Sequence, residues 1–528
     1  MRQRRLAPTS IPSVPLITDS RYAALMTYVW RWRVAIMATS VGVLAALLRF
    51  VALGWPNALV FDEVFYVRGA FSLATMGYEG NWTGDNDAFA QGDLSGLETE
   101  GDFVVHPMVG KLLVAAGIEL FGNNPFGWRV MGALLGTIMC VMIAFIARHL
   151  FRSTLWGLIA GVFLAVDGQA IVLSRTALLD IFLTFFAVAG FGAILIDRHV
   201  SRSRLTARAA DARVAAGLER DAPLPGMGPG LGIRWWRWGA IAMFALSGSV
   251  KWSGFYFAAA FLLLSVLWDF IDRRAAGIHR WAAGAFLRAI PAGILAVVST
   301  LVIYAATWFP WFMSEDSYGR HWAETNPGKG ATWLPDSLNS LVHYHLQMWS
   351  FHENLTTEHN YMSNPWLWLV QWRPTAFFFE DAPDADCGAT RCVSAVHALG
   401  NPFIWWAGTV ALGYAVYRVI RYRDMLAITM SLGAFAAWIP WLPYSYRTIF
   451  TFYTIAMVPF VVLTLVWALK HIAQPDRLRR AWSRRGTIAV VAFIGGVLVI
   501  SGLFAPLWLG TPIPFAYWQA HMWLPSWI

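Results

Sequence analysis

Long apolar segments alternate with short polar ones along almost the whole chain. About 20 apolar residues are enough for a helix to cross a hydrocarbon layer of ~30 Å, and in lipid the backbone must satisfy its own hydrogen bonds. We therefore expect eleven membrane-spanning helices and an all-α polytopic membrane protein. The expected spans are 34–54, 129–147, 155–173, 178–196, 238–252, 254–270, 289–309, 401–417, 425–443, 448–469 and 487–507.

The composition supports this interpretation. Hydrophobic residues make up 57% of the 528 positions and charged residues only 13%, whereas a soluble protein carries roughly 25% charged residues. The net charge of +9 requires no nucleic-acid partner, because the arrangement of the spans accounts for most of the basic residues.

Placing the N-terminus inside puts about three quarters of the 40 lysines and arginines on the inner side, as the positive-inside rule requires. We expect residues 1–33 to be a basic cytosolic tail, since they lack the apolar core of a signal peptide. The inner loop 198–237 is expected to be poorly ordered. Several cations remain on the outer side against this bias, among them Arg49, Lys111, Arg129, Arg175, Lys251 and Arg447.

Two outer loops are long, at about 55–128 and 310–400. In the first, "NALVFDEVFYVRGAFSLATM" and "PMVGKLLVAAGIELFG" are amphipathic and too short to span, which predicts helices lying in the membrane interface. The Gly- and Asp-rich linker between them is expected to be mobile. The second loop contains Cys387 and Cys392, whose pairing in an oxidising compartment the sequence leaves open.

Two adjacent carboxylates, Asp62 and Glu63, follow the first span. Acids in a first helical turn can simply complement the helix dipole, for about 0.3–1 kcal/mol. Adjacent side chains on a helix point roughly 100° apart, so the two acids cannot do the same job. Tyr66 lies one turn beyond Asp62 on the same face, so one carboxylate can face a reaction centre and the other a second ligand.

Further along the first loop, "FVVHPMVGKLL" places His106 beside Pro107, which is expected to start a helix. His106 then lies near a helix N-terminus, where anions are favoured. Lys111 follows on the first turn, where it can hold an anion or snorkel from an interfacial helix.

Other cations and acids fall at the outer ends of spans. Arg129 lies at the mouth of the second span, Arg175 in the turn after the third, and Lys251 at a polar corner with small neighbours that would admit an anionic ligand. Arg49 and Arg447 can be ligand-binding or snorkelling residues. Asp167 and Asp180 lie within or at the ends of spans, where a carboxylate costs something like 2.5–3.5 kcal/mol, and ionic pairing and function are equally open for both.

An acidic pair and several cations on one membrane face suit a reaction between a lipid-linked anionic donor and an acceptor that needs a base. Cations would hold a phosphate and stabilise the charge that grows as it leaves, while a carboxylate would take the acceptor's proton. No metal motif occurs, and the histidines lack ligand spacing.

These pieces, in this order, resemble the protein O-mannosyltransferases, membrane glycosyltransferases with the GT-C fold. The matching motifs are "FDEVFYVRGA", "HPMVGK", "GWR", "SRTALLD", "VKWSG" and "FTFYTIAMVP", with Arg49 ahead of them. The family usually has His-Pro-Pro where this chain has Met108. The loop at 310–400 is too short for the β-trefoil (MIR) domain of eukaryotic members, so the chain is most similar to actinobacterial ones.

The resemblance implies a catalytic domain over residues 34–528. Asp62 would be the general base, Glu63 would help place the acceptor peptide, and Arg129 and Lys251 would hold the donor phosphate. The supporting residues would be Arg49, His106, Lys111 and Arg175, to which we add Arg447 from its position. One base predicts a single inverting displacement, and the anionic leaving group predicts no metal and no cofactor.

The implied reaction transfers mannose from polyprenyl-phosphate-mannose to Ser and Thr of exported proteins at the outer face of the cell membrane. The expected partners are this donor, the exported proteins and membrane lipids, with the Sec translocon left open. A mannosyltransferase with a lipid or glycan acceptor is one alternative. A transporter or flippase is another, although it should carry its charges near the membrane midplane.

Overall fold

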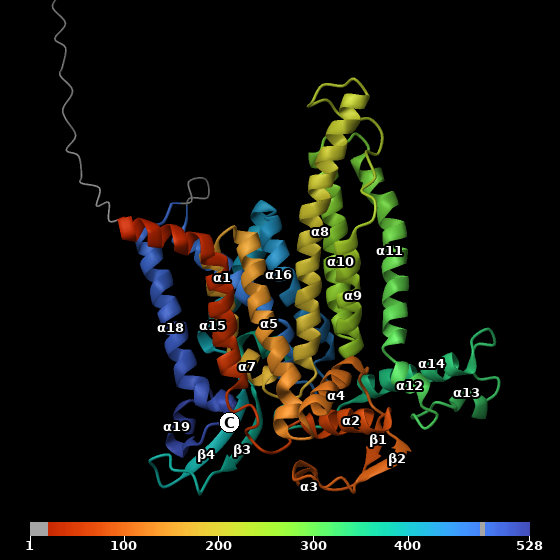
Figure 1. The fold of residues 1–528 in the computed structure, drawn as a ribbon, viewed down its shortest axis with the longest axis vertical. Coiled ribbons are helices and arrows are strands. Elements are labelled where there is room, and N and C mark those ends of the chain that lie inside the picture. Colours follow the sequence, from red (N-terminus) through yellow and green to blue (C-terminus); the bar gives the residue numbers. More distant parts are fainter. Residues whose placement is uncertain (1–19, 476–480) are drawn as a thin grey trace, which may run out of the picture.

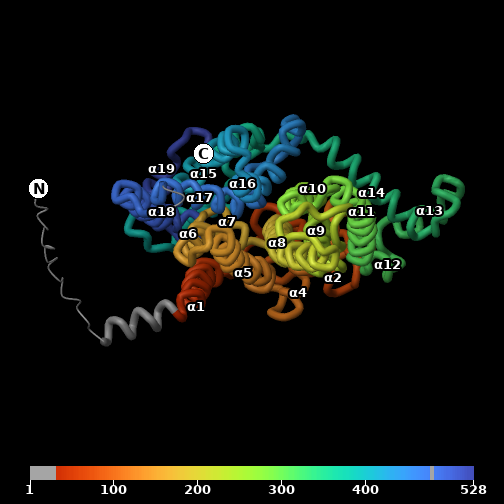
Figure 2. The backbone as a smooth tube through the Cα atoms, turned by 90° about the horizontal axis from the view of Figure 1, so that it is seen from above, coloured from red at the N-terminus to blue at the C-terminus, as the bar shows by residue number. Residues whose placement is uncertain are grey.

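The structure, a computed structural model, describes residues 20–475 and 481–528, with side chains from residue 31 onward. Long helices stand side by side, and short helices and strands gather at one end of the bundle (Figure 1). We call this the loop-rich end. Helix α1 (Ser20–Phe50) begins at the opposite end, while the C-terminus lies at the loop-rich end. Viewed from above, α11 (Trp281–Ala306) and α18 (Arg484–Leu509) lie on opposite sides of the bundle (Figure 2).

Each of the eleven predicted spans contains a helix, but fewer qualify as complete spans. Among the described residues, eight helices are long and apolar enough to cross a membrane, or nine if the bent pair α6–α7 counts as one span. The chain is therefore a multi-pass membrane protein. The eight are α1, α5 (Pro125–Phe151), α8 (Asp180–Ala215), α10 (Gly254–Ala275), α11, α15 (Pro402–Tyr422), α16 (Met425–Trp438) with the η2 turn (Ile439–Tyr444), and α18.

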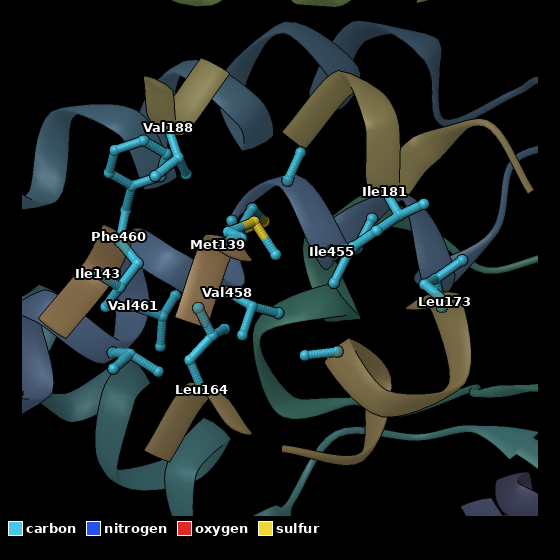
Figure 3. Close-up of a cluster of buried hydrophobic side chains, with 14 of the residues drawn as sticks. Met139, Ile143, Leu164, Leu173, Ile181, Val188, Ile455, Val458, Phe460 and Val461 are labelled. Atoms are coloured by element: carbon cyan, nitrogen blue, oxygen red, sulfur yellow. The ribbon is translucent and has the colours of Figure 1, made fainter. Parts of the chain in front are cut away.

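Two predicted spans are shorter, namely α9 (Trp235–Val250) and α17 (Val458–Ala473), with 16 residues each. Most side chains of α17 are buried, as expected of a helix that is largely apolar all round. Its Val458, Phe460 and Val461 contact side chains of surrounding helices, including Ile143 of α5 and Val188 of α8 (Figure 3). The helix packs against α15, α16 and α18 and is preceded by the η3 turn (Thr451–Ala456).

The predicted span 155–173 is broken. Helices α6 (Thr154–Ala165) and α7 (Gly168–Ser174) meet at 61°. Asp167 starts α7, because its carboxylate accepts hydrogen bonds from the backbone N–H groups of Ala170 (3.1 Å) and Asn401 (3.0 Å). This intramembrane acid is thus a helix cap.

Arg49 binds the carbonyl groups that the break leaves without helical partners. Its guanidinium donates to the carbonyl oxygens of Leu164 (3.4 Å) and Ala165 (3.2 Å), and to Ser174 Oγ (3.2 Å). The Arg49 side chain is fully buried. The sequence predicts a supporting role for Arg49, and in the structure Arg49 joins α1, α6 and α7.

The first outer loop contains both predicted interfacial helices, α2 (Glu63–Met76) and α4 (Val109–Phe121), which pack against each other. The linker between them is not the mobile segment that we expected. It forms an antiparallel pair of strands, β1 (Gly80–Trp82) and β2 (Leu97–Gly101), connected through α3 (Asn86–Ala90). Phe89 of α3 is buried against Phe71, Trp82 and Trp128, and this aromatic packing orders the linker.

The second outer loop also folds at the loop-rich end. It contains α12 (Phe309–Met313), α13 (Trp322–Thr325), α14 (Asp336–Asn354) and the η1 turn (Pro365–Val370). Strands β3 (Thr375–Asp381) and β4 (Cys392–Ala398) pair in antiparallel fashion, from Thr375 opposite Ala398 to Asp381 opposite Val393. Strand β5 (Ile513–Pro514) joins β4 from the C-terminal segment, which continues through α19 (Phe515–Ala520) and the η4 turn (Pro525–Trp527).

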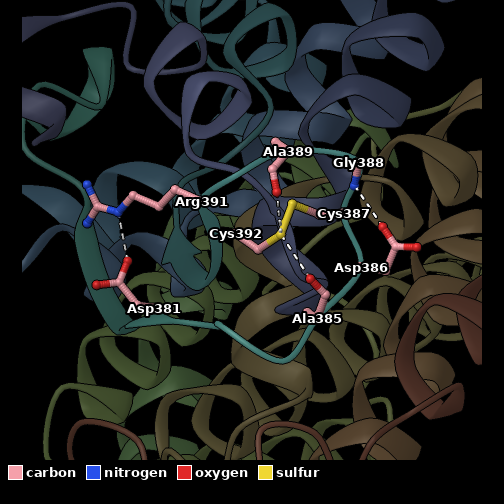
Figure 4. Close-up of a disulfide and its surroundings, with 8 residues drawn as sticks. All are labelled: Asp381, Ala385, Asp386, Cys387, Gly388, Ala389, Arg391 and Cys392. Atoms are coloured by element: carbon pink, nitrogen blue, oxygen red, sulfur yellow. Dashed lines mark hydrogen bonds and ion pairs between the residues drawn. A yellow bond between two sulfur atoms is a disulfide. The ribbon is translucent and has the colours of Figure 1, made fainter.

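A disulfide links Cys387, in the turn between β3 and β4, to Cys392, the first residue of β4 (Figure 4). Beside it, Arg391 pairs with Asp381 at 2.8 Å across the same hairpin. The pairing that the sequence left open therefore occurs. Cys140 is a buried free thiol.

At the opposite end, the structure differs from two expectations. Helix α8 continues to Ala215, so the first half of the loop 198–237 is helical instead of poorly ordered. Arg198 pairs with Asp272 of α10 at 3.9 Å and lies over the Trp268 ring, which holds α8 against α10. Helix α1 begins at Ser20, within the predicted tail, and residues 1–19 lie outside the described residues.

The break between α6 and α7 requires a residue without a side chain at Gly168. A Cβ atom there would lie 2.0 Å from Trp508 Cε2 and 2.4 Å from the Leu399 carbonyl oxygen. We expect Gly168→Ala to destabilise the protein by about 1–3 kcal/mol through overpacking, measured as a lower thermal unfolding temperature in detergent. Gly192→Ala on α8 is the matched control, because its nearest atom would be 3.6 Å away. Equal unfolding temperatures for the two variants would contradict this account.

Candidate active site

The turn before α2 presents Asp62. Phe61 has φ of 50°, a left-handed conformation that costs a bulky residue about 1–3 kcal/mol. Its ring lies 5.0 Å from Phe377 and 5.4 Å from Phe450, and this packing offsets the strain. Asp62 occupies the N-cap position but makes no side-chain capping hydrogen bond. Its carboxylate is therefore available for another purpose.

Glu63, the next residue, is completely buried and fully engaged. Its carboxylate accepts hydrogen bonds from Nε and Nη2 of Arg129 (2.8 Å each), from the backbone N–H of Val60 (2.9 Å) and from that of Ala177 (2.8 Å). In this structure Glu63 thus faces Arg129 and the backbone, and its expected contact with the incoming peptide stays a prediction. Four hydrogen-bond donors surround the carboxylate, and none of the side chain is exposed to solvent.

Arg129 is enclosed in the same way. Besides Glu63, its guanidinium binds the backbone carbonyl oxygens of Leu53 (3.4 Å), Pro56 (2.9 Å) and Ala58 (2.8 Å), and the side chain is 0% exposed. Its expected contact with the donor phosphate stays a prediction. Arg129 fixes the segment that leads from α1 to Asp62.

Arg175 completes this scaffold from the turn after α7. It donates to the carbonyl oxygens of Val51 (2.7 Å) and Ala52 (2.8 Å) at the end of α1. Glu63 reaches the same turn through Ala177. The supporting roles predicted for Arg49 and Arg175 thus consist of tying α1 to the break and to the turn before α8.

Asp62 shares its surroundings with three polar groups. The hydroxyl of Tyr66 donates to Asp62 Oδ2 at 3.5 Å. Burial raises the pKa of Asp62 to about 6, partly opposed by the charge of Lys251 and increased by that of Asp180. A carboxylate with this pKa is largely ionised at neutral pH and is still basic enough to take a proton, which suits general base catalysis.

Lys251 lies at the polar corner between α9 and α10, as predicted, and is 7% exposed. Its ammonium donates to Asp180 Oδ2 at 2.7 Å and lies 5.6 Å from the Tyr66 ring centre and 5.3 Å from that of Tyr453. Asp180 therefore pairs with a lysine at the site. The ion pair fixes the Lys251 ammonium beside the Asp62 carboxylate. The ammonium also has further N–H donors besides the one that binds Asp180.

Two histidines extend the site. His106 and His352, of α14, stack with ring centres 5.2 Å apart, and His352 Nε2 lies 2.8 Å from the Val105 carbonyl oxygen. Burial, with the neighbouring charges of Lys251 and Arg447, lowers the pKa of His106 well below its usual range and that of His352 to about 4. Both imidazoles are neutral at physiological pH.

Lys111 and Arg447 lie around this pair in different ways. Lys111 forms a buried ion pair with Glu79 and donates to the His106 carbonyl oxygen at 3.2 Å, so it orients the histidine segment. Arg447 is 8% exposed and lies over the Tyr444 ring, 5.9 Å from its centre. Among the described residues, Arg447 Nε has no hydrogen-bond partner.

The structure thus brings Asp62, His106, Lys251 and Arg447 together, and places Glu63, Arg129, Arg49 and Arg175 in the scaffold behind them. Sequence reasoning did not assign roles to His352 and Tyr453. The signals that could have found them are the His- and Tyr-rich composition of the second outer loop and the late motif "FTFYTIAMVP", which contains Tyr453. Within the described part of the chain, no group of three or more His, Cys, Asp or Glu side chains could hold a metal ion.

Comparison with known proteins gives two family matches. Residues 39–206 match the dolichyl-phosphate-mannose-protein mannosyltransferase family, and residues 337–527 match the C-terminal four-transmembrane region of protein O-mannosyltransferases. The two matches contain Asp62, Glu63, Arg129 and Arg447, while Lys251 lies between them.

Curated relatives align over the whole length. The polyprenol-phosphate-mannose–protein mannosyltransferase of Mycobacterium tuberculosis is 34% identical, over 98% of this chain and 96% of its own. The Corynebacterium glutamicum protein of the same name is also 34% identical, over 100% of this chain and 98% of its own.

Among solved structures, the S. cerevisiae protein O-mannosyltransferase complex bound to the sugar donor superposes with a TM-score of 0.69 at 14% identity, covering 94% of this chain and 92% of that chain. This likeness shows that the chain has the expected GT-C fold. Together with the whole-length relatives, it shows that the chain belongs to the protein O-mannosyltransferase family.

Proposed function

We propose that this protein transfers mannose from polyprenyl-phosphate-mannose to the hydroxyl groups of Ser and Thr in exported proteins. The names of its relatives, M. tuberculosis and C. glutamicum polyprenol-phosphate-mannose–protein mannosyltransferases, support the donor and the protein acceptor. The observation that carries the proposal is the Asp62 carboxylate. This carboxylate makes no helix-capping hydrogen bond, its pKa is raised to about 6, and it lies beside the fixed cation Lys251.

In the proposed reaction, Asp62 takes the proton of the acceptor hydroxyl. The oxygen's electron pair forms a new bond to the anomeric carbon of mannose, while the bond from that carbon to the phosphate oxygen breaks. The bonding electrons stay on the phosphate, so negative charge grows there. One displacement inverts the anomeric carbon, and a β-linked donor gives an α-mannoside.

Lys251 and Arg447 are the cations placed to stabilise the leaving phosphate. Both are nearly buried, where a fixed positive charge stabilises a developing anion more than it does in water. Asp180 holds the Lys251 ammonium in place through the 2.7 Å hydrogen bond. The neutral imidazoles of His106 and His352 add hydrogen-bonding groups without competing for the negative charge.

We further propose that the N-terminus is cytoplasmic and that the site faces the outside of the cell membrane. Several observations support this orientation. Helix α1 begins at the end of the bundle opposite the loop-rich end, and the basic inner loops predicted from the sequence connect helices there. The Cys387–Cys392 disulfide at the loop-rich end suits an oxidising compartment. An acceptor emerging from the Sec translocon would meet this face.

Asp62→Asn should lower transfer by about 10²–10⁴-fold, the usual contribution of a general base. The assay uses membranes, labelled polyprenyl-phosphate-mannose and a Ser/Thr-rich peptide.

In the wild type, kcat/KM should fall tenfold for each pH unit below about 6, because the base must be deprotonated to work. Burial disfavours the ionised form, so Asp62→Asn should not lower the unfolding temperature. Asp93→Asn, which alters an exposed acid of the same loop, is the control.

Full transfer by Asp62→Asn would overturn the assignment of the base. Label that reaches only lipid in the wild type, and never the peptide, would instead overturn the protein acceptor. The two failures are therefore distinguishable in one assay.

Glu63→Gln should behave differently, because Glu63 anchors the site. The variant leaves the Arg129 guanidinium without its carboxylate partner, which costs about 3–5 kcal/mol for a buried pair. We expect a lower unfolding temperature together with lost transfer, whereas Asp62→Asn loses transfer alone. Arg391→Gln breaks an exposed ion pair and should change stability by at most about 1 kcal/mol. A stable Glu63→Gln protein that binds peptide poorly would restore the predicted acceptor role.

We also propose that the reaction needs no divalent metal, because the leaving phosphate meets cationic side chains. Transfer should continue when EDTA is present throughout the assay. Activity that disappears in EDTA and returns with an added divalent ion would contradict this.

A further inference from the structure

A cavity lined by both basic and apolar side chains lies far from Asp62. It has a volume of ≈1120 Å³ and is enclosed by α1, the end of α5, the start of α6, the middle of α8 and the start of α16. Arg198 in its wall follows Asp180 by 18 positions on α8, which corresponds to about 27 Å along a helix. This is close to the ~30 Å thickness of the hydrocarbon layer. The cavity therefore opens at the membrane face opposite the active site.

Four arginines from two sides carry the charge of this cavity, which we call the basic cavity. Arg148 and Arg152 come from the end of α5, and Arg198 and Arg202 from α8, with Arg33 of α1 also in the wall. Two histidine rings, His149 and His199, lie between the two sides with centres 6.0 Å apart. Among the described residues, no carboxylate lines the cavity.

A nearby carboxylate only partly compensates this charge. Asp272 lies 3.9 Å from both Arg198 and Arg202, so one acid is shared between two guanidiniums. Arg198 and Arg202 lie one helical turn apart on α8 and repel one another, and a phosphate group would relieve the repulsion through charge-assisted hydrogen bonds.

The apolar residues in the wall indicate that the bound phosphate belongs to a lipid. Leu150, Leu155, Leu195, Met425 and Leu426 line the same cavity. A free phosphate needs only the basic residues, whereas a phospholipid also presents acyl chains that the apolar residues would contact. Basic pockets between membrane helices on the cytoplasmic side commonly bind anionic lipid headgroups.

We propose that the basic cavity binds the headgroup of an anionic phospholipid of the inner leaflet. The arginines of α5 and α8 contact the phosphate, and the leucines contact the first part of the acyl chains. A bound lipid would thereby hold α5 and α8 together at the face opposite the reaction, and this binding does not depend on the proposed mannosyl transfer.

The test titrates the purified full-length protein with phosphatidylglycerol in neutral detergent and reads the bound lipid by native mass spectrometry. The double variant Arg152→Gln/Arg202→Gln should bind phosphatidylglycerol about thirtyfold more weakly than the wild type, since each arginine near an anionic lipid contributes about fivefold. The control Arg31→Gln/Arg220→Gln lowers the net charge equally. Both of its arginines are exposed and lie outside the cavity wall, so its affinity should stay within about twofold.

Three results would overturn the proposal. They are equal affinity of the two double variants, equal binding of phosphatidylcholine, and displacement of the lipid by inorganic phosphate at matched concentration. The last result would show that the cavity binds the anion alone. If the cavity variant unfolds at a lower temperature, a photoactivatable phosphatidylglycerol on the wild type decides instead. Cross-links on the α5 and α8 peptides that line the cavity support the proposal, and their absence contradicts it.

Discussion

The buried ion pair between Glu63 and Arg129 is the interaction on which the site depends. Through its partners it connects the end of α1, the start of α2 and the turn that leads into α8. A buried ion pair contributes little net stability, because desolvation consumes most of the attraction. Its value here is geometric. Each remaining donor and acceptor of the pair binds backbone, so the chain on either side of Asp62 is held in one position.

This arrangement divides two adjacent acids between different tasks. Glu63 is surrounded by four hydrogen-bond donors, so its negative charge is balanced. Asp62 is partly exposed, receives only a long hydrogen bond from Tyr66 and lies in the field of Lys251, and burial raises its pKa to about 6. Poor solvation destabilises the ionised form of the Asp62 carboxylate, which costs the protein free energy. The same destabilisation makes the carboxylate more basic.

The two ends of the bundle use cations differently. At the loop-rich end, Lys251 and Arg447 are nearly buried and few, which suits the stabilisation of one developing charge. At the opposite end, the arginines of α5 and α8 are numerous and surround a wide cavity with apolar walls, which suits a bound headgroup. Helix α8 connects the two, since Asp180 begins it and Arg198 and Arg202 lie about 27–33 Å further along.

The sequence by itself determined the membrane class, the approximate positions of the helices, the two interfacial helices and some of the residues around Asp62, among them His106 and Lys251. Apolar length, charge bias and local motifs are properties of short segments, so they can be read without knowing the fold. The break at Asp167 was not visible, because the cap is completed by the N–H of Asn401, more than two hundred residues away. For the same reason, only the tertiary structure decided that Glu63 and Arg129 are anchors and that His352 joins His106. Whether a charged side chain faces a ligand or a neighbour depends on which segments distant in the sequence pack beside it.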